Sequence, residues 1–130
     1  MAITPVKDLV AAAKSQIETL SPDQAQAAAD DGSALLVDIR DPRELAREGR
    51  IPGAFHAPRG MIEFWIDPAS PYFKEALATG QKLIFFCASA WRSALTVKTL
   101  QDMGVDNIAE IEGGFGKWRK DGHPVDKKDV

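Results

Sequence analysis

Short, almost uninterrupted apolar runs alternate with helix-like segments along most of the chain. The runs ALLVDIR (34–40), KLIFF (82–86) and NIAEI (107–111) contain few polar positions, and AFHAP (54–58) is a further brief run. Such continuity is typical of strands that are buried on both faces of a parallel sheet. Helical patterns lie between the runs, at 41–49 and 93–104. The alternation predicts an α/β fold, a three-layer sandwich with a central, mainly parallel sheet flanked by helices.

The first 32 residues have a different, helical pattern. Apolar side chains recur at helical spacing through Val6, Leu9, Val10, Ala13, Ile17 and Leu20, which predicts a first helix. A second helix is predicted from Ser21, where SPDQ is a capping box and Gly32 a stop signal. We therefore expect an N-terminal helical extension (1–32) packed on the main domain (33–125), followed by a charged tail (126–130).

Composition narrows the function classes. The 130 residues are 45% hydrophobic and 27% charged, with a formal net charge of -3, which suits one globular domain and disfavours nucleic-acid binding. Apolar runs fall far short of the roughly 20 residues of a membrane span, and the N-terminus lacks a secretion-signal pattern. The one cysteine cannot form an intrachain disulfide. We expect a cytoplasmic protein with no membrane partner.

The chemistry is concentrated in FFCASAWRSAL, residues 85–95. Cys87 follows a predicted strand, and ligands in open α/β sheets bind beyond the carboxyl ends of strands. A helix is predicted to begin near Arg92 or Ser93, and its free N–H groups would stabilise a thiolate. Small residues between them allow a tight backbone curl. From these residues alone, two interpretations of Cys87 stay open: a small buried core residue or an activated nucleophile in an anion cradle.

Several other residues have both a functional and a structural interpretation. Trp91 walls the pocket or packs beside the helix, and Ser89 and Ser93 bond the substrate or cap the local structure, with capping preferred for Ser93. Asp38 and Arg40, at the end of the first long strand, are expected to form a structural ion pair. The remaining candidates are expected to pack or turn rather than react: His56, His123, Gly113, Gly114 and the aromatic residues Phe64, Trp65, Tyr72 and Phe73.

Four segments in order resemble the rhodanese family of sulfurtransferases. They are LLVDIRDPRE (35–44), GRIPGAFHAP (49–58), CASAWRS (87–93) and NIAEIEGGFGKWRKDGHPV (107–125). The resemblance implies that Cys87 carries a sulfane sulfur as a persulfide, received from a small anionic donor such as thiosulfate. The acceptor would be a thiol, cyanide or a protein. It also implies that the loop of Ala88, Ser89, Ala90, Trp91 and Ser93 binds substrate, that Arg92 supplies positive potential, and that neither a metal nor an organic cofactor takes part.

The resemblance also bears on competing activities. Cys87 through Arg92 is six residues, as in rhodaneses, whereas the related phosphatases have seven and a wider cradle. Sulfur transfer is therefore favoured over phosphatase or arsenate reductase activity, with a sulfur-relay or binding module of little thiosulfate turnover as the alternative. The sequence departs from the family pattern at Ala90, where glycine is usual, and at Arg50, where histidine is usual. If residue 90 has a positive φ, alanine adds about 1 kcal/mol of strain.

Overall fold

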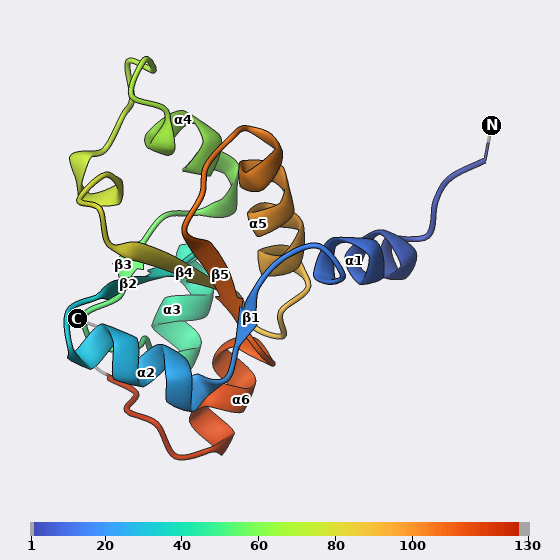
Figure 1. Ribbon diagram of the computed structural model, residues 1–130. Helices are drawn as coiled ribbons and strands as arrows, with labels where there is room; N and C mark the ends of the chain where they lie inside the picture. Colours follow the sequence, from blue (N-terminus) through green and yellow to red (C-terminus); the bar gives the residue numbers. More distant parts are fainter. Residues whose placement is uncertain (1, 128–130) are drawn as a thin grey trace.

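The computed structural model describes residues 2–127 and contains a central parallel sheet (Figure 1). Its five strands lie in the order β1-β5-β4-β2-β3. Their bounds are β1 Thr19–Leu20, β2 Ala34–Asp38, β3 Phe55–His56, β4 Lys82–Phe86 and β5 Ile108–Ile111. All pairings between these strands are parallel. The α/β prediction is confirmed, and the apolar runs at 34–40, 82–86 and 107–111 contain the three inner strands.

Helices connect the strands and cover both faces of the sheet. They are α1 Val6–Lys14, α2 Pro22–Asp30, α3 Pro42–Glu48, α4 Ile62–Ile66, α5 Arg92–Asp102 and α6 Gly114–Lys120, with short 3₁₀ turns at Arg59–Met61 and Glu75–Leu77. The predicted capping box of α2 is present: Ser21 Oγ accepts from the Gln24 N–H at 3.1 Å, and Gln24 Oε1 accepts from the Ser21 N–H at 2.9 Å. Local sequence signals thus start this helix as expected.

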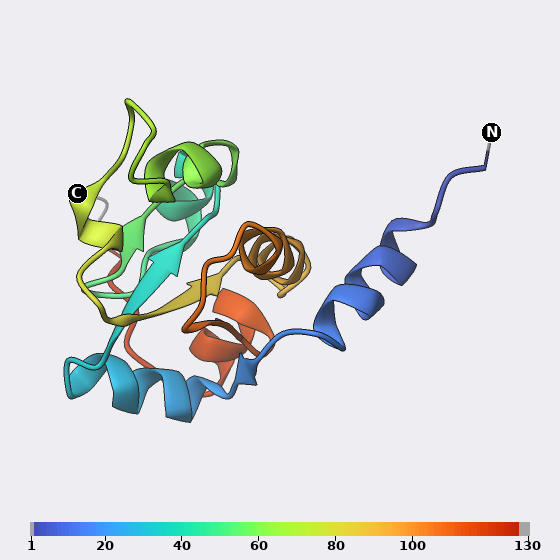
Figure 2. The ribbon, with the colours of Figure 1, turned by 45° about the horizontal axis from the view of Figure 1, so that its top comes forward.

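The strands have two buried faces because separate layers of helix pack on each side (Figure 2). On β4, Leu83 and Phe85 belong to one core cluster, which also holds Val97 and Leu100 of α5. The intervening Ile84 and Phe86 belong to a second cluster with Ala25 of α2 and with Phe115 and Trp118 of α6. This alternation follows from the two-residue period of a strand. It explains why the apolar runs have no polar face.

The N-terminal prediction is wrong at one point. The first helix ends at Lys14, and Thr19–Leu20 forms the edge strand β1, which pairs in parallel with β5. The Glu110 N–H donates to the Glu18 carbonyl at 3.0 Å, and the Glu112 N–H donates to the Leu20 carbonyl at 2.8 Å. Without β1, the backbone groups on the edge of β5 that faces away from β4 would be unpaired. This tertiary pairing overrides the helical spacing of the side chains. Residues 1–32 are therefore not a purely helical extension.

Helix α1 packs against α5, and its N-terminal part projects from the body of the protein (Figures 1 and 2). Its buried residues, Val10 and Ala13, pack with Ala94 of α5. At the other end of the chain, the Arg50 and Asp126 backbones form an isolated antiparallel bridge. The predicted charged tail begins there, and its residues 128–130 lie outside the described residues. None of the helices in residues 2–127 has the length and apolar character that crossing a membrane requires.

Candidate active site

The loop between β4 and α5 lies at the carboxyl edge of the sheet, beside the ends of β2 and β5. Strand β4 ends at Phe86 and α5 begins at Arg92, as the sequence predicts. Cys87 is 1% exposed and Ala90 is 2% exposed, whereas Trp91 is 48% exposed. Ser89 is exposed and Ala88 is half-buried. The thiol thus lies beneath its own loop, and Trp91 faces solvent above it.

The loop curls because one residue has the left-handed backbone conformation. Ala90 has φ 69°, one of two positive values among the described non-glycine residues. The condition for strain at this position is therefore met, since a Cβ disfavours this region by roughly 1–2 kcal/mol. Helix α6 fixes the loop from the other side. The Phe115 N–H donates to the Cys87 carbonyl at 2.8 Å, and the Gly116 N–H donates to the Ala88 carbonyl at 3.0 Å.

The turn that brings α6 to the loop depends on glycine. Gly113 and Gly114 both have positive φ, 71° and 62°. A Cβ on Gly114 would lie 2.6 Å from the Cys87 carbonyl oxygen, closer than such atoms approach in proteins. The predicted role of this pair as a tight turn is confirmed. Gly114 also allows α6 to approach the active-site loop closely.

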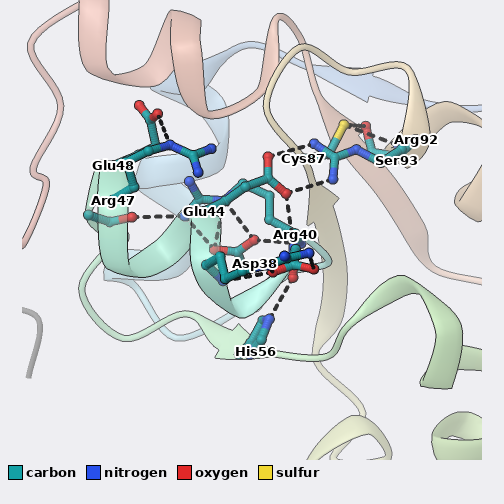
Figure 3. Close-up of polar contacts among 12 residues, drawn as sticks. Asp38, Arg40, Glu44, Arg47, Glu48, His56, Cys87, Arg92 and Ser93 are labelled. Carbon is teal, nitrogen blue, oxygen red and sulfur yellow. Dashed lines mark hydrogen bonds and ion pairs between the residues drawn. The ribbon is translucent and has the colours of Figure 1, made fainter.

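Ser93, rather than Arg92, provides the closest hydrogen bonds to the sulfur (Figure 3). The Ser93 N–H donates to Cys87 Sγ at 3.4 Å, and Ser93 Oγ lies 3.6 Å from the same sulfur. The Ser93 hydroxyl then donates to Glu110 Oε1 at 2.7 Å. Capping of α5 by Ser93 is therefore a wrong prediction: Trp91 occupies the N-cap position, without a side-chain bond.

Arg92 is held by a carboxylate from another helix. Its Nη1 and Nη2 donate to Glu44 Oε1 and Oε2 of α3 at 2.8 and 3.0 Å (Figure 3). The Arg92 hydrogen bonds lower the pKa of Glu44 to about 2. The pKa of Arg92 is raised, mainly by its side-chain hydrogen bonds to Glu44. This bidentate pair fixes a positive charge beside the thiol. Glu44 was not among the predicted site residues; the sequence marks it only as the third residue after Asp41 in the capping box that begins α3.

The end of β2, which neighbours β4 in the sheet, carries a buried ion pair. Arg40 Nη2 lies 2.8 Å from Asp38 Oδ2, and the two side chains are 1% and 2% exposed. The guanidinium also covers the Phe115 ring at 4.1 Å and donates to the Gly49 carbonyl. His56 Nε2 contacts the Arg40 carbonyl oxygen at 2.7 Å. The expected structural ion pair is confirmed, and His56 is half-buried against it.

The aromatic residues of the middle segment do not share one environment. Trp65 packs edge-on to Phe55 with ring centroids 6.2 Å apart, which is a core contact. Phe64 and Tyr72 are 52% and 59% exposed. Within residues 2–127, no group of three or more His, Cys, Asp or Glu side chains is arranged to hold a metal ion.

Comparison with known proteins identifies a family. The model of the family described as Rhodanese, the rhodanese-like domain, matches residues 21–121. A sulfurtransferase from Allochromatium vinosum is 30% identical over 100 residues, covering 77% of this chain and 85% of the relative. An uncharacterised Synechocystis protein is 28% identical over 109 residues, which cover 84% of this chain and 56% of the Synechocystis protein.

Two solved structures extend the comparison. A protein of unknown function from Rhodopseudomonas palustris, described as a possible tyrosine phosphatase, is 48% identical, with a TM-score of 0.91 and coverage of 97% of both chains. The polysulfide-sulfur transferase homodimer of Wolinella succinogenes is 32% identical, with a TM-score of 0.69 and coverage of 92% of this chain and 85% of that chain. The family match begins at Ser21 and so includes α2, which the sequence division placed in the extension.

Proposed function

The chain belongs to the rhodanese-like domain family, and on that premise we propose that it is a sulfurtransferase in which Cys87 carries sulfur as a persulfide. One observation supports this most strongly. The Cys87 sulfur lies at the end of the central strand β4, 3.4 Å from the Ser93 N–H in the first turn of α5. A helix N-terminus and a neighbouring guanidinium both stabilise a sulfur anion at this point.

The first half-reaction loads the enzyme. The Cys87 thiolate attacks the outer sulfur of an anionic donor, forming a new S–S bond as the donor's own bond to that sulfur breaks. With thiosulfate, sulfite leaves with the bonding electron pair. With a polysulfide, the substrate class named for the Wolinella succinogenes relative, a shortened polysulfide leaves. Residues 88–91 surround the persulfide, and the charge of Arg92 attracts either anion.

The second half-reaction discharges it. A thiolate or cyanide attacks the outer sulfur of the persulfide, takes that sulfur, and returns Cys87 as a thiolate. The alternative proposal is a sulfur relay, in which the acceptor is a protein and free thiosulfate is turned over slowly. The 48% exposed Trp91 beside the loop favours contact with such a partner. We also infer a cytoplasmic location, because reducing compartments keep a reactive thiol free.

Phosphatase activity is the competing proposal raised by the Rhodopseudomonas palustris relative. Our proposal disfavours it because the loop from Cys87 through Arg92 has six residues, one fewer than in the related phosphatases. In addition, both terminal nitrogens of Arg92 already bind Glu44, at 2.8 and 3.0 Å. A phosphoryl group would have to compete with this carboxylate for the guanidinium fork.

Intact-mass measurement tests the proposal. We expect the protein to gain one sulfur atom on incubation with thiosulfate or polysulfide, and to lose it on addition of cyanide or a thiol. The Cys87→Ser variant should gain none. Steady-state turnover then separates the enzyme from the relay, and hydrolysis of an aryl phosphate tests the phosphatase. Failure of every sulfane donor to add sulfur to Cys87 would refute sulfur transfer.

A further inference from the structure

Glu110 is a buried carboxylate that the persulfide mechanism does not use. It lies on β5 and is 0% exposed. Its oxygens accept from Lys14 Nζ of α1 at 2.8 Å, from Thr19 Oγ1 of β1 at 3.2 Å and from Ser93 Oγ of α5 at 2.7 Å. A charge buried this completely is costly unless it is paired and hydrogen-bonded. Two elements near the N-terminus, α1 and β1, and the helix α5 provide those partners, and Ser93 of α5 also contacts the Cys87 sulfur.

The hydrogens at Ser93 can be counted. A hydroxyl has one hydrogen to donate, and an ionised carboxylate can only accept. With Glu110 ionised and 2.7 Å away, the Ser93 hydrogen lies between these two oxygens. The lone pairs of Ser93 Oγ then face Cys87 Sγ, 3.6 Å away. These lone pairs accept a hydrogen bond from the sulfur only if the sulfur keeps its own hydrogen. The arrangement therefore fits a thiol better than a thiolate.

We propose that Glu110 sets the ionisation of Cys87 through the Ser93 hydroxyl. While Glu110 is charged, it accepts the hydrogen bond of the Ser93 hydroxyl, and Cys87 remains a thiol. The thiolate forms when the Cys87 S–H proton passes to Ser93 Oγ and the former Ser93 hydroxyl proton passes to Glu110 Oε1. The number of protons is unchanged: a thiol and a carboxylate become a thiolate and a carboxylic acid. Glu110 never touches the sulfur and is a positioning residue.

Charges from every neighbouring element bias this exchange. Lys14 of α1 stabilises the Glu110 carboxylate at 2.8 Å and so favours the thiol. Arg92 of α5 favours the thiolate, and Glu44 of α3 partly neutralises Arg92 at 2.8 Å. Asp38 and Arg40, at the end of β2, are paired at 2.8 Å and compensate each other. The balance therefore depends on the contact between Lys14 and Glu110, and through it on the position of α1.

The test measures the ionisation of Cys87 in the full chain, without any sulfur donor. The probes are thiolate ultraviolet absorbance and the rate of alkylation by iodoacetamide, each followed against pH. Glu110→Gln should lower the pH midpoint of ionisation by about one unit, which means an about tenfold higher ratio of thiolate to thiol below the midpoint. The control Glu112→Gln removes the same charge at an exposed position two residues away and should leave the midpoint unchanged.

Ser93→Ala is a second variant. It tests the proposal if circular dichroism shows that Glu110→Gln does not fold. It keeps the backbone N–H that contacts Cys87 and removes the hydroxyl. If that hydroxyl stabilised the thiolate, its loss would raise the midpoint; our proposal predicts a lower midpoint. An unchanged or raised midpoint in Ser93→Ala or in folded Glu110→Gln would overturn it. The inference rests on the proposed function only for its role in sulfur transfer, because a midpoint measured without donor is independent of whether Cys87 accepts sulfur.

Discussion

Replacing Ala90 with glycine removes the strain that the left-handed backbone places on the active-site loop. Ala90 has φ 69°, which costs an L-residue roughly 1–2 kcal/mol. Against this gain, the substitution removes a buried methyl group, which contributes about 0.8 kcal/mol. Glycine also increases the entropy of the unfolded chain, at about 0.5–1 kcal/mol. We therefore expect the free energy of unfolding of Ala90→Gly to stay within about 1 kcal/mol of wild type.

A matched substitution in regular structure makes this prediction decisive. Ala25 is 0% exposed in the interior of α2, where glycine costs about 1 kcal/mol of helix propensity in addition to the lost methyl group. Ala25→Gly should therefore lose about 2 kcal/mol in urea unfolding. The sulfur-transfer rate of Ala90→Gly should equal or exceed that of wild type. If Ala90→Gly lost as much stability as Ala25→Gly, or most of its activity, the strain argument would be wrong.

Three further substitutions test the residues that hold the Cys87 loop and its neighbours in place. Glu44→Gln should cost about 1 kcal/mol at neutral pH, because the partner Arg92 is partly exposed. The folded pKa of Glu44, about 2, lies below its usual value, so this contribution is present above about pH 5 and is lost as pH falls toward 2. Arg40→Met should cost about 3–5 kcal/mol in urea unfolding, because it leaves Asp38 buried and unpaired. Gly114→Ala should cost about 3 kcal/mol and slow persulfide formation, since its Cβ would displace the active-site carbonyl.

Each of these has an outcome that would contradict it. The Glu44→Gln prediction is contradicted if the difference in unfolding free energy between variant and wild type is the same at pH 7 as at low pH. For Arg40→Met, the contradicting outcome is a loss below about 1 kcal/mol, which would mean that Asp38 finds another partner or water. The control for Gly114→Ala is Gly122→Ala, at φ 87° with no atom within 4 Å of the added Cβ, where only about 1 kcal/mol is expected. Equal losses at Gly114 and Gly122 would remove the case for a close contact at the loop.

Much of the fold could be predicted because its signals are local. The apolar runs that predict β2, β4 and β5 reflect burial on both faces, and SPDQ starts α2 through hydrogen bonds within one turn. The same holds for the placement of Cys87 between a strand and a helix. The first helix was overextended because the helical spacing of Ile17 and Leu20 gives no information on β5, which lies about ninety residues further along the chain.

The parallel sheet, the position of the Cys87 loop, its six-residue length and, through four motifs, the family can all be predicted from the order of the amino acids. The partners of that loop cannot, because they come together only in the folded chain. Glu44 binds Arg92 across 48 positions, and Lys14 binds Glu110 across 96. Such pairs leave no periodicity or spacing in the sequence, because they depend on how strands and helices pack together. For the same reason Ser93, which looked like a helix cap, proves to lie between the sulfur and a buried carboxylate.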